Sequence, residues 1–412
     1  MYLMCILDRC RGACLTSVLL AGTFVARGQG VSPQGGEINL TGLRPGDQVL
    51  PAVALSPATR VIAFYNQGQG IYAADLNNNN TSASIFSVNK TAIGDQVRPA
   101  VAILRGGQTL FVWQSKTLGN ADIFARFASG STISSRTDVL VNSHVKDQQV
   151  DPVVTALLDG GAMVAWASYG QDGSGWGVYA RKLTAAGAVT PSAEFMVNRN
   201  VSGSQRHPAI CRLANGNVVI AWVSDIQRSV WSVDIYARIF SPTGSPITDE
   251  FRVNSSTNKC VTPALAPLAN GGFTAVWAQH DPNPTNGMDI WARAFSANGS
   301  PSVAAFRVND HQAGDQFQPR VASAPSGVLV VWDSLGQDGD RDGIFGRFLG
   351  GGAAVSGNEF QVNTTWMSQQ LEPDVAWNGV DRFLVVWSSF TGLMQGQQIC
   401  GFDLFGQVYV LK

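Results

Sequence analysis

Short apolar segments separated by glycine-rich or polar turns run through most of the chain. In one stretch the segments are PAVAIL at 99–104, GGQTLFVW at 106–113 and ADIFARF at 121–127. A fourth kind of segment ends in the pattern EFxVN, as at 250–254. Each is four to eight residues long, rich in β-branched and aromatic residues and bounded by turn residues, which predicts β-strands rather than helices. The sequence therefore predicts an all-β protein.

The four segments recur as one unit along the chain. A Val-Asn pair closes each unit and is repeated at intervals of 50 to 56 residues. The pairs begin at Val88, Val141, Val197, Val253, Val308 and Val362, with a degenerate seventh at Ile38. A proline follows each pair, at Pro51, Pro99, Pro152, Pro208, Pro263, Pro319 and Pro373. Four strands per repeat, seven times over, predict a seven-bladed β-propeller with four-stranded antiparallel blades, whereas a β-sandwich does not repeat in this way and a β-helix has a shorter period.

The two ends of the repeat region suggest how the ring closes. Residues 37–40 (EINL) match the last strand of a unit but precede the first complete unit, and the seventh unit lacks that strand. We expect the early strand to complete the last blade, because a shared strand removes two unpaired sheet edges. The predicted domain is 37–412. Its predicted blades are 51–89, 99–142, 152–198, 208–254, 263–309, 319–363, and 373–412 together with 37–40.

The first 30 residues have a different character. Arg9 and Arg11 precede an apolar stretch over 14–26, which is typical of a signal peptide, although a short N-terminal strand or a misassigned start codon would give the same pattern. We therefore expect residues 1–30 to be a leader and the protein to be secreted or held at the cell surface. No later apolar run reaches the ~18 residues of a membrane span. Only 14% of residues are charged and the net charge is -1, which argues against nucleic-acid binding.

Residues repeated in every unit are first of all structural. An aromatic residue follows each proline by 13 or 14 positions, beginning with Tyr65 and continuing with six tryptophans, and we expect it to pack on the neighbouring blade. Arginines such as Arg126 and Arg181 are expected to stack on the ring two residues earlier, between blades.

The repeat unit resembles repeats of secreted bacterial proteins with the pattern EFxVN, QxxPxVAxL, GGxVVVWxSxGQDG and IYARxF, and residues 168–181 are the best copy. The resemblance covers 37–412. It implies an extracellular β-propeller-type module, often part of large calcium-rich proteins, and no catalytic motif.

Chemistry is expected where loops depart from the repeat. Extra aromatic residues on these loops are candidates for stacking on sugar rings: Tyr169, Trp176, Trp231 and Trp366. Alternate aspartates at Asp338, Asp340 and Asp342 resemble a calcium loop and could bind Ca²⁺ if they converge on one centre, although a plain solvated turn would read the same.

Two functions remain open at this stage. Seven nearly regular blades without a catalytic motif favour a secreted, non-enzymatic propeller that binds a glycan or an extracellular protein, or that serves as a scaffold. The alternative is a carbohydrate-active enzyme, either a polysaccharide lyase or a glycoside hydrolase. For a lyase, His207 or Tyr169 would act as the base and Arg206 would neutralise the uronate.

Overall fold

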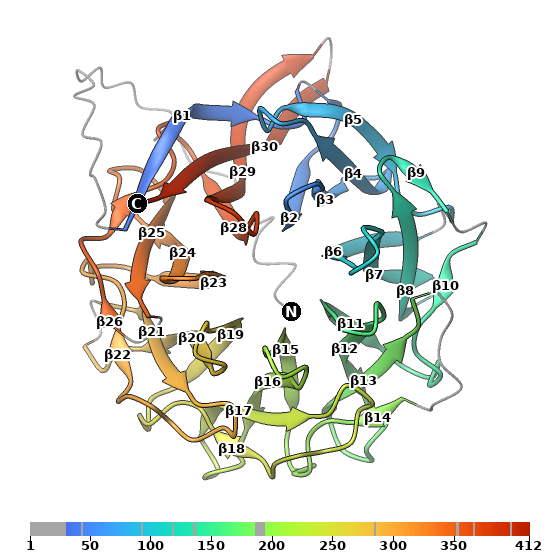
Figure 1. Cartoon of the computed structure of the whole chain (residues 1–412), viewed down its shortest axis with the longest axis vertical. Helices are drawn as coiled ribbons and strands as arrows, with labels where there is room; N and C mark the ends of the chain where they lie inside the picture. Colours follow the sequence, from blue (N-terminus) through green and yellow to red (C-terminus); the bar gives the residue numbers. More distant parts are fainter. Residues whose placement is uncertain are drawn as a thin grey trace.

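The chain forms a ring of seven antiparallel sheets arranged around a central axis (Figure 1). The computed structural model describes residues 30–42, 44–91, 94–117, 119–134, 137–185, 194–283, 286–351, 354–365, 367–395 and 398–412. The expected leader therefore lies almost entirely outside the described residues. Each sheet is one blade, so the seven-bladed propeller predicted from the repeats is confirmed.

Each blade runs from an inner strand near the axis of the ring to an outer strand at the rim. The inner strands are β2 (Gln48–Leu55), β6 (Asp95–Ile103), β11 (Gln149–Ala156), β15 (Gln205–Arg212), β19 (Cys260–Pro267), β23 (Gln316–Ala324) and β28 (Gln370–Trp377). The second strands are β3 (Arg60–Asn66), β7 (Thr109–Thr117), β12 (Ala162–Tyr169), β16 (Val218–Asp225), β20 (Phe273–His280), β24 (Gly327–Leu335) and β29 (Arg382–Gln395). The third strands are β4 (Gly70–Leu76), β8 (Asn120–Ser129), β13 (Trp176–Leu183), β17 (Val233–Phe240), β21 (Met288–Phe295), β25 (Asp342–Gly350) and β30 (Gln398–Leu411).

Most outer strands are short, and only those of the first and last blades are longer than two residues. The outer strands are β5 (Ser82–Ser87), β10 (Val139–Leu140), β14 (Phe195–Met196), β18 (Phe251–Arg252), β22 (Phe306–Arg307), β27 (Phe360–Gln361) and, in the last blade, β1 (Val31–Asn39). Two further short strands, β9 (Thr132–Ile133) and β26 (Ala354–Val355), pair with third strands. Neighbouring strands are antiparallel, so inner strands begin, and second strands end, on the same side of the ring. We call this side the mouth face.

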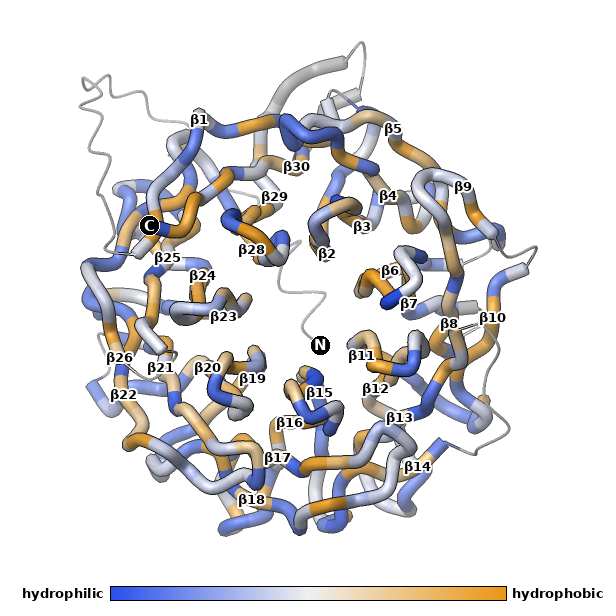
Figure 2. The backbone as a smooth tube through the Cα atoms, in the orientation of Figure 1, coloured by the Kyte–Doolittle hydropathy of each residue, from blue (hydrophilic) through white to orange (hydrophobic). Residues whose placement is uncertain are grey.

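One large aromatic ring per blade builds the core. Trp113, Trp166, Trp222, Trp277, Trp332 and Trp387 are fully buried, and each packs in a cluster with side chains of the preceding blade. In blade one this place belongs to Phe64 rather than to the expected Tyr65, because Tyr65 pairs with Val49 while Phe64 lies opposite the irregular step of the inner strand. Hydrophobic residues follow the strands, and hydrophilic residues gather in the loops at the rim (Figure 2).

The early strand closes the ring, as the sequence predicts. β1 is hydrogen-bonded to β30, so the last blade combines both ends of the described chain. Val31 and Leu40 are each 1% exposed, and the Glu37 carboxylate accepts hydrogen bonds from the backbone of Thr364 (3.0 Å) and Thr365 (3.2 Å) in the turn after blade six. Closure thus combines sheet pairing, apolar burial and a charged latch.

The repeated arginines join neighbouring blades by hydrogen bonds. Arg126 donates to the carbonyl oxygen of Val88 (2.7 Å), and Arg347 donates to that of Val308 (2.7 Å), in each case the valine of the preceding Val-Asn pair. Stacking on the ring two residues earlier, which the sequence suggested, is replaced in two blades by a ring two residues later: Arg238 lies over Phe240 at 5.4 Å. Their role between blades is structural.

Within the described part of the chain, no helix has the length and apolar character needed to cross a membrane.

Candidate functional site

Every inner strand carries the same irregularity one residue before its proline. The pairing register with the second strand shifts there, as in β15 between Arg206 and Ala209. The seven residues at this step have a left-handed backbone although none is glycine: Leu50 (φ 56°), Arg98 (53°), Asp151 (55°), His207 (52°), Thr262 (50°), Gln318 (47°) and Glu372 (58°). Such a conformation costs about 1–3 kcal/mol per residue and is retained where the surrounding structure imposes it. We call these seven residues the mouth ring.

Three consecutive members of the mouth ring contact one another. The Asp151 carboxylate forms an ion pair with Arg98, with Oδ1 3.1 Å from Nε, and its Oδ2 lies 2.9 Å from His207 Nδ1. A carboxylate requires a donor, so Nδ1 carries the proton and the lone pair of the neutral imidazole is on Nε2. The side chain of His207 is 41% exposed, whereas that of Asp151 is 15% exposed. The arrangement is an oriented histidine with a solvent-accessible basic nitrogen.

Asp151 is held in its ionised form. Burial opposes ionisation, but the charge of Arg98, the hydrogen bond and charge of His207, and the charge of Arg206 together lower the pKa of Asp151 to about 2. The acceptor for His207 Nδ1–H is therefore present at any ordinary pH.

Three carboxyl groups whose pKa is raised, in contrast to that of Asp151, lie in blades six and seven. Glu372, in the mouth ring, accepts from the backbone N–H of Leu50 (2.8 Å), and Asp374 accepts from that of Val53 (2.8 Å). Asp333, at 5% exposure, lies behind Glu372, and its Oδ1 has no hydrogen-bond partner within the described chain. Burial raises the pKa of all three carboxyls, most strongly that of Asp333, where the negative charges of Asp342 and Glu372 add to the effect.

Arg98 connects the two sides of the mouth. Its charge lowers the pKa of Asp151 in blade three and, against the larger effect of burial, that of Glu372 in blade seven. Both carboxyls also belong to the mouth ring, so they lie on the same face of the propeller. Two titratable groups whose surroundings push their pKa values apart are the usual basis for separate acid and base roles.

Asp333 gives a stability prediction whose sign is fixed by the raised pKa. The folded state keeps a proton that the unfolded chain loses, so the wild-type protein loses stability as the pH rises above about 4. We expect Asp333→Asn to match the wild type at pH 3 and to be more stable at pH 8 by about 1–3 kcal/mol, because the amide neither has to keep a proton above the ordinary pKa of a carboxyl nor has to bury a negative charge. Thermal melts across this range measure the difference. Asp249→Asn, at a side chain that is 79% exposed, is the control, and an equal or lower melting temperature of Asp333→Asn at pH 8 would contradict the prediction.

The structure shows which groups surround the lyase candidates. His207 pairs with Asp151. Arg206 forms an ion pair with Asp225 at the end of β16. The Tyr169 ring contacts the edge of Trp176, with ring centres 5.2 Å apart, in the loop of blade three. The predicted base and arginine are thus adjacent at the mouth, and Tyr169 belongs to the aromatic pair beside them.

The remaining aromatic candidates differ in exposure. Trp176 is half-buried against Tyr169, which is 46% exposed, and Trp231 is 86% exposed in the loop of blade four. Trp366 lies outside the described residues.

The three aspartates considered for calcium have separate partners. Asp338 accepts weakly from Asn363 (3.4 Å), Asp340 accepts from the backbone of Ser368 (2.7 Å) and Asp342 accepts from Gln369 (3.1 Å). Asp338 turns inward over Gly343, in the place that Asp234 and Asp289 occupy in blades four and five. The three carboxylates therefore have different partners, and the described residues hold no group of three or more histidine, cysteine or acidic side chains arranged for a metal ion.

Four residues of the site were missed from the sequence, namely Arg98, Asp151, Asp333 and Glu372. For Arg98, Asp151 and Glu372 the available signal was the column before the repeated proline, which reads Leu, Arg, Asp, His, Thr, Gln and Glu across the blades, whereas Asp333 lies outside that column. Side chains of such different chemistry at equivalent positions do not share one structural role in the blades.

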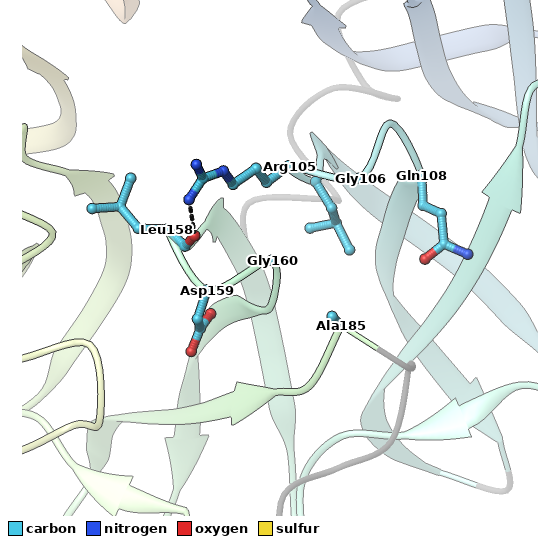
Figure 3. Close-up of a pocket in the computed structure, with 8 residues that line it drawn as sticks. Arg105, Gly106, Gln108, Leu158, Asp159, Gly160 and Ala185 are labelled. Atoms are coloured by element: carbon cyan, nitrogen blue, oxygen red, sulfur yellow. Dashed lines mark hydrogen bonds between the residues drawn. The ribbon is translucent and has the colours of Figure 1, made fainter.

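A depression of about 460 Å³ lies on the face opposite the mouth, between blades two and three (Figure 3). Its walls include Arg105, which donates to the carbonyl oxygen of Leu158 (2.9 Å), and Asp159. Asp159 is tied to Lys182, and the ionisable groups of the mouth are absent from its walls. We therefore place the candidate site at the mouth.

Comparisons with known proteins support the fold. No protein-family model matches the chain, and none of the curated proteins matches its sequence. Among solved structures, a protein of unknown function from Dyadobacter fermentans is 12% identical with a TM-score of 0.55, and the match covers 93% of this chain and 100% of that one. The polysaccharide lyase Uly1 is 11% identical with a TM-score of 0.57, covering 91% and 94%. An α-L-arabinofuranosidase from Fusarium graminearum is 12% identical with a TM-score of 0.52, covering 88% and 98%. The propeller fold is thus shared with proteins named for acting on carbohydrates.

Proposed function

We propose that the protein is a carbohydrate-active enzyme that cleaves uronate-containing polysaccharides by β-elimination at the mouth of the propeller. The observation that carries the proposal is the Asp151–His207 pair, because it presents a basic nitrogen at an open position of the mouth ring between two arginines. The expectation that the chain is exported, and its likeness to secreted bacterial repeat proteins, agree with a polymeric substrate outside the cell.

The chemistry needs only groups of this chain. His207 Nε2 removes the proton from C5 of the uronate ring, while Arg98 and Arg206 face the sugar carboxylate and stabilise the charge that develops on it. The electron pair of the C5–H bond forms the C4=C5 double bond as the C4–O bond breaks. The leaving oxygen takes a proton from Glu372, whose raised pKa keeps the acid form available. The products are an unsaturated uronate end and a free hydroxyl group.

Incubation with polygalacturonate, alginate and chondroitin sulfate tests the reaction, because the unsaturated end absorbs at about 235 nm. We expect absorbance to rise with at least one of these polymers. A polymer that binds without being cleaved would instead support the non-enzymatic binding function that the regular blades favour.

Glu372→Gln gives a prediction for the acid role. The amide keeps the acceptor for Leu50 N–H but cannot donate a proton to the leaving oxygen, so we expect kcat to fall by about 10²-fold or more with little change in KM. The alkaline limb of the pH–rate profile should disappear with it. An unchanged profile would exclude Glu372 as the acid.

Glycoside hydrolysis is the second candidate, and the contrast between Glu372 and Asp151 favours it. A carboxyl with a raised pKa and one held ionised can serve as acid and base around a sugar. New reducing ends without absorbance at 235 nm would identify hydrolysis at the same site.

A further inference from the structure

The loop between β16 and β17 carries the two most exposed large apolar side chains of the described chain, Trp231 and Val230, and a third exposed one, Ile226. Trp231 is 86% exposed, Val230 is 71% exposed and Ile226 is 44% exposed. We call these three residues the blade-four tip. An exposed tryptophan lacks the favourable free energy that burial of a large aromatic ring contributes. Exposed apolar groups of this kind often mark binding sites, so the tip is a candidate contact for a ligand.

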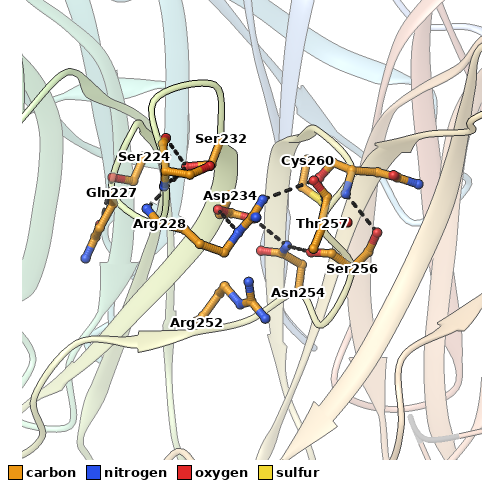
Figure 4. A network of polar contacts seen from close by, with 12 residues as sticks. Ser224, Gln227, Arg228, Ser232, Asp234, Arg252, Asn254, Ser256, Thr257 and Cys260 are labelled. Atoms are coloured by element: carbon orange, nitrogen blue, oxygen red, sulfur yellow. Dashed lines mark hydrogen bonds and ion pairs between the residues drawn. The ribbon is translucent and has the colours of Figure 1, made fainter.

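The tip stands on a firmly bonded loop (Figure 4). Arg228 donates to the buried carboxylate of Asp234 (2.9 Å) and to the carbonyl oxygen of Thr257 (3.0 Å) in the turn before blade five. The Ser232 hydroxyl accepts from the backbone N–H groups of Arg228 (3.2 Å) and Ser229 (3.1 Å). The Ile226 N–H donates to the Ser232 carbonyl at 2.8 Å, which closes the loop. A contact surface that is ordered before binding avoids most of the entropic cost of immobilising it.

The tip is connected to the mouth ring within blade four. Arg206, the neighbour of His207 in the chain, forms an ion pair with Asp225 at the end of β16, and Ile226 follows Asp225 directly. Gly203, which precedes β15, lies so close to Ile226 that a side chain there would collide with it. The proposed base and the exposed tryptophan thus belong to one strip of the mouth face.

We propose that the blade-four tip is a sugar-binding subsite, in which the Trp231 ring stacks on the apolar face of a pyranose unit of the same polysaccharide chain whose neighbouring units occupy the mouth. The inference rests on the proposed function and adds the substrate class: a chain long enough to reach from His207 to Trp231, rather than a short oligosaccharide. The ring supplies apolar contact area and loses little side-chain freedom on binding.

The binding test uses the His207→Gln variant, so that turnover does not alter the ligand, with polygalacturonate, alginate and chondroitin sulfate as probes. We expect at least one polymer to change the tryptophan fluorescence, and addition of Trp231→Ala to abolish that change and weaken binding by about tenfold, equal to about 1.4 kcal/mol. Ile247→Ala, at a side chain that is 50% exposed on the opposite face, is the control and should bind like its parent. Unaltered affinity of the Trp231→Ala protein, or binding of none of the three polymers, would overturn the subsite.

Kinetics separates this inference from the proposed function. In the otherwise unaltered protein, Trp231→Ala should raise KM for the polymer, leave kcat unchanged and have no effect on cleavage of a tetrasaccharide. If His207→Gln retains activity while Trp231→Ala still weakens binding, the β-elimination mechanism fails and the subsite stands. If His207→Gln is inactive and Trp231→Ala has wild-type affinity, the subsite fails and the mechanism stands.

Discussion

Replacement of His207 by glutamine is expected to lower kcat for polymer cleavage by about 10²- to 10⁴-fold, the usual contribution of a general base. Glutamine is similar in size and can still donate to Asp151, so the mouth ring should keep its shape, but no basic nitrogen remains at the position of Nε2. KM should change little, because the arginines that face the sugar carboxylate are untouched. Steady-state rates at 235 nm, together with a thermal melt, measure both effects.

The matched control is His311→Gln, in a loop of the same face. His311 takes part in the structure through its backbone, which accepts from Asn309 (2.6 Å) and donates to Glu359 (3.1 Å), so its side chain can change without loss of these bonds. Asp151→Asn should be nearly as damaging as His207→Gln, because the acceptor that fixes the Nδ1–H tautomer is altered and Arg98 loses its counter-charge. Full activity of His207→Gln would remove the histidine from the mechanism.

Loss of the closing strand is expected to be the most destabilising change in the fold. A chain that begins at Gly42 lacks β1, and with it the buried Val31 and Leu40, the pairing with β30 and the Glu37 latch. Burial of two such side chains contributes about 3–6 kcal/mol, a large share of the roughly 5–15 kcal/mol that holds a typical protein folded. The freed edge of β30 would also favour association between molecules.

The reference for this comparison is a chain that begins at Gly30, so that the two proteins differ only in residues 30–41. Urea unfolding should show a lower midpoint for the shorter chain, and size-exclusion chromatography should show oligomers. Equal midpoints and a monomeric profile would mean that β1 is not what holds the ring closed.

The fold could be predicted because the same pattern of strands and turns recurs in each repeat unit. A glutamine lies three residues before the proline in six of the seven units, and in blades two, three and six it accepts from the repeated tryptophan, as Gln96 does from Trp113 (2.9 Å). The asparagine of the Val-Asn pair accepts from the backbone of the third strand, as Asn142 does from Ile123 (2.7 Å). Residues tied in this way recur in register, and their spacing fixes the strands. The same regularity made Tyr65 look like the core aromatic, since the one-residue shift that favours Phe64 depends on sheet pairing.

The site could be predicted only in part, because it is assembled by neighbouring blades rather than by neighbouring residues. His207 was found as a departure from the repeat, but Asp151 and Arg98 lie 56 and 109 positions away in the chain and meet it only through the left-handed step of three inner strands. The aspartates around Asp338 show the opposite relation between sequence and space. They are close in sequence, yet the turn sends their carboxylates to different partners.

A crystal structure of the His207→Gln variant soaked with a uronate tetrasaccharide tests the central claim most directly, namely that the chemistry of this propeller is located at the mouth ring. The account predicts a sugar carboxylate facing Arg98 and Arg206, with C5 of that unit next to the side chain at position 207. A saccharide bound on the opposite face, near Leu158, with the mouth ring free of it, would contradict the account.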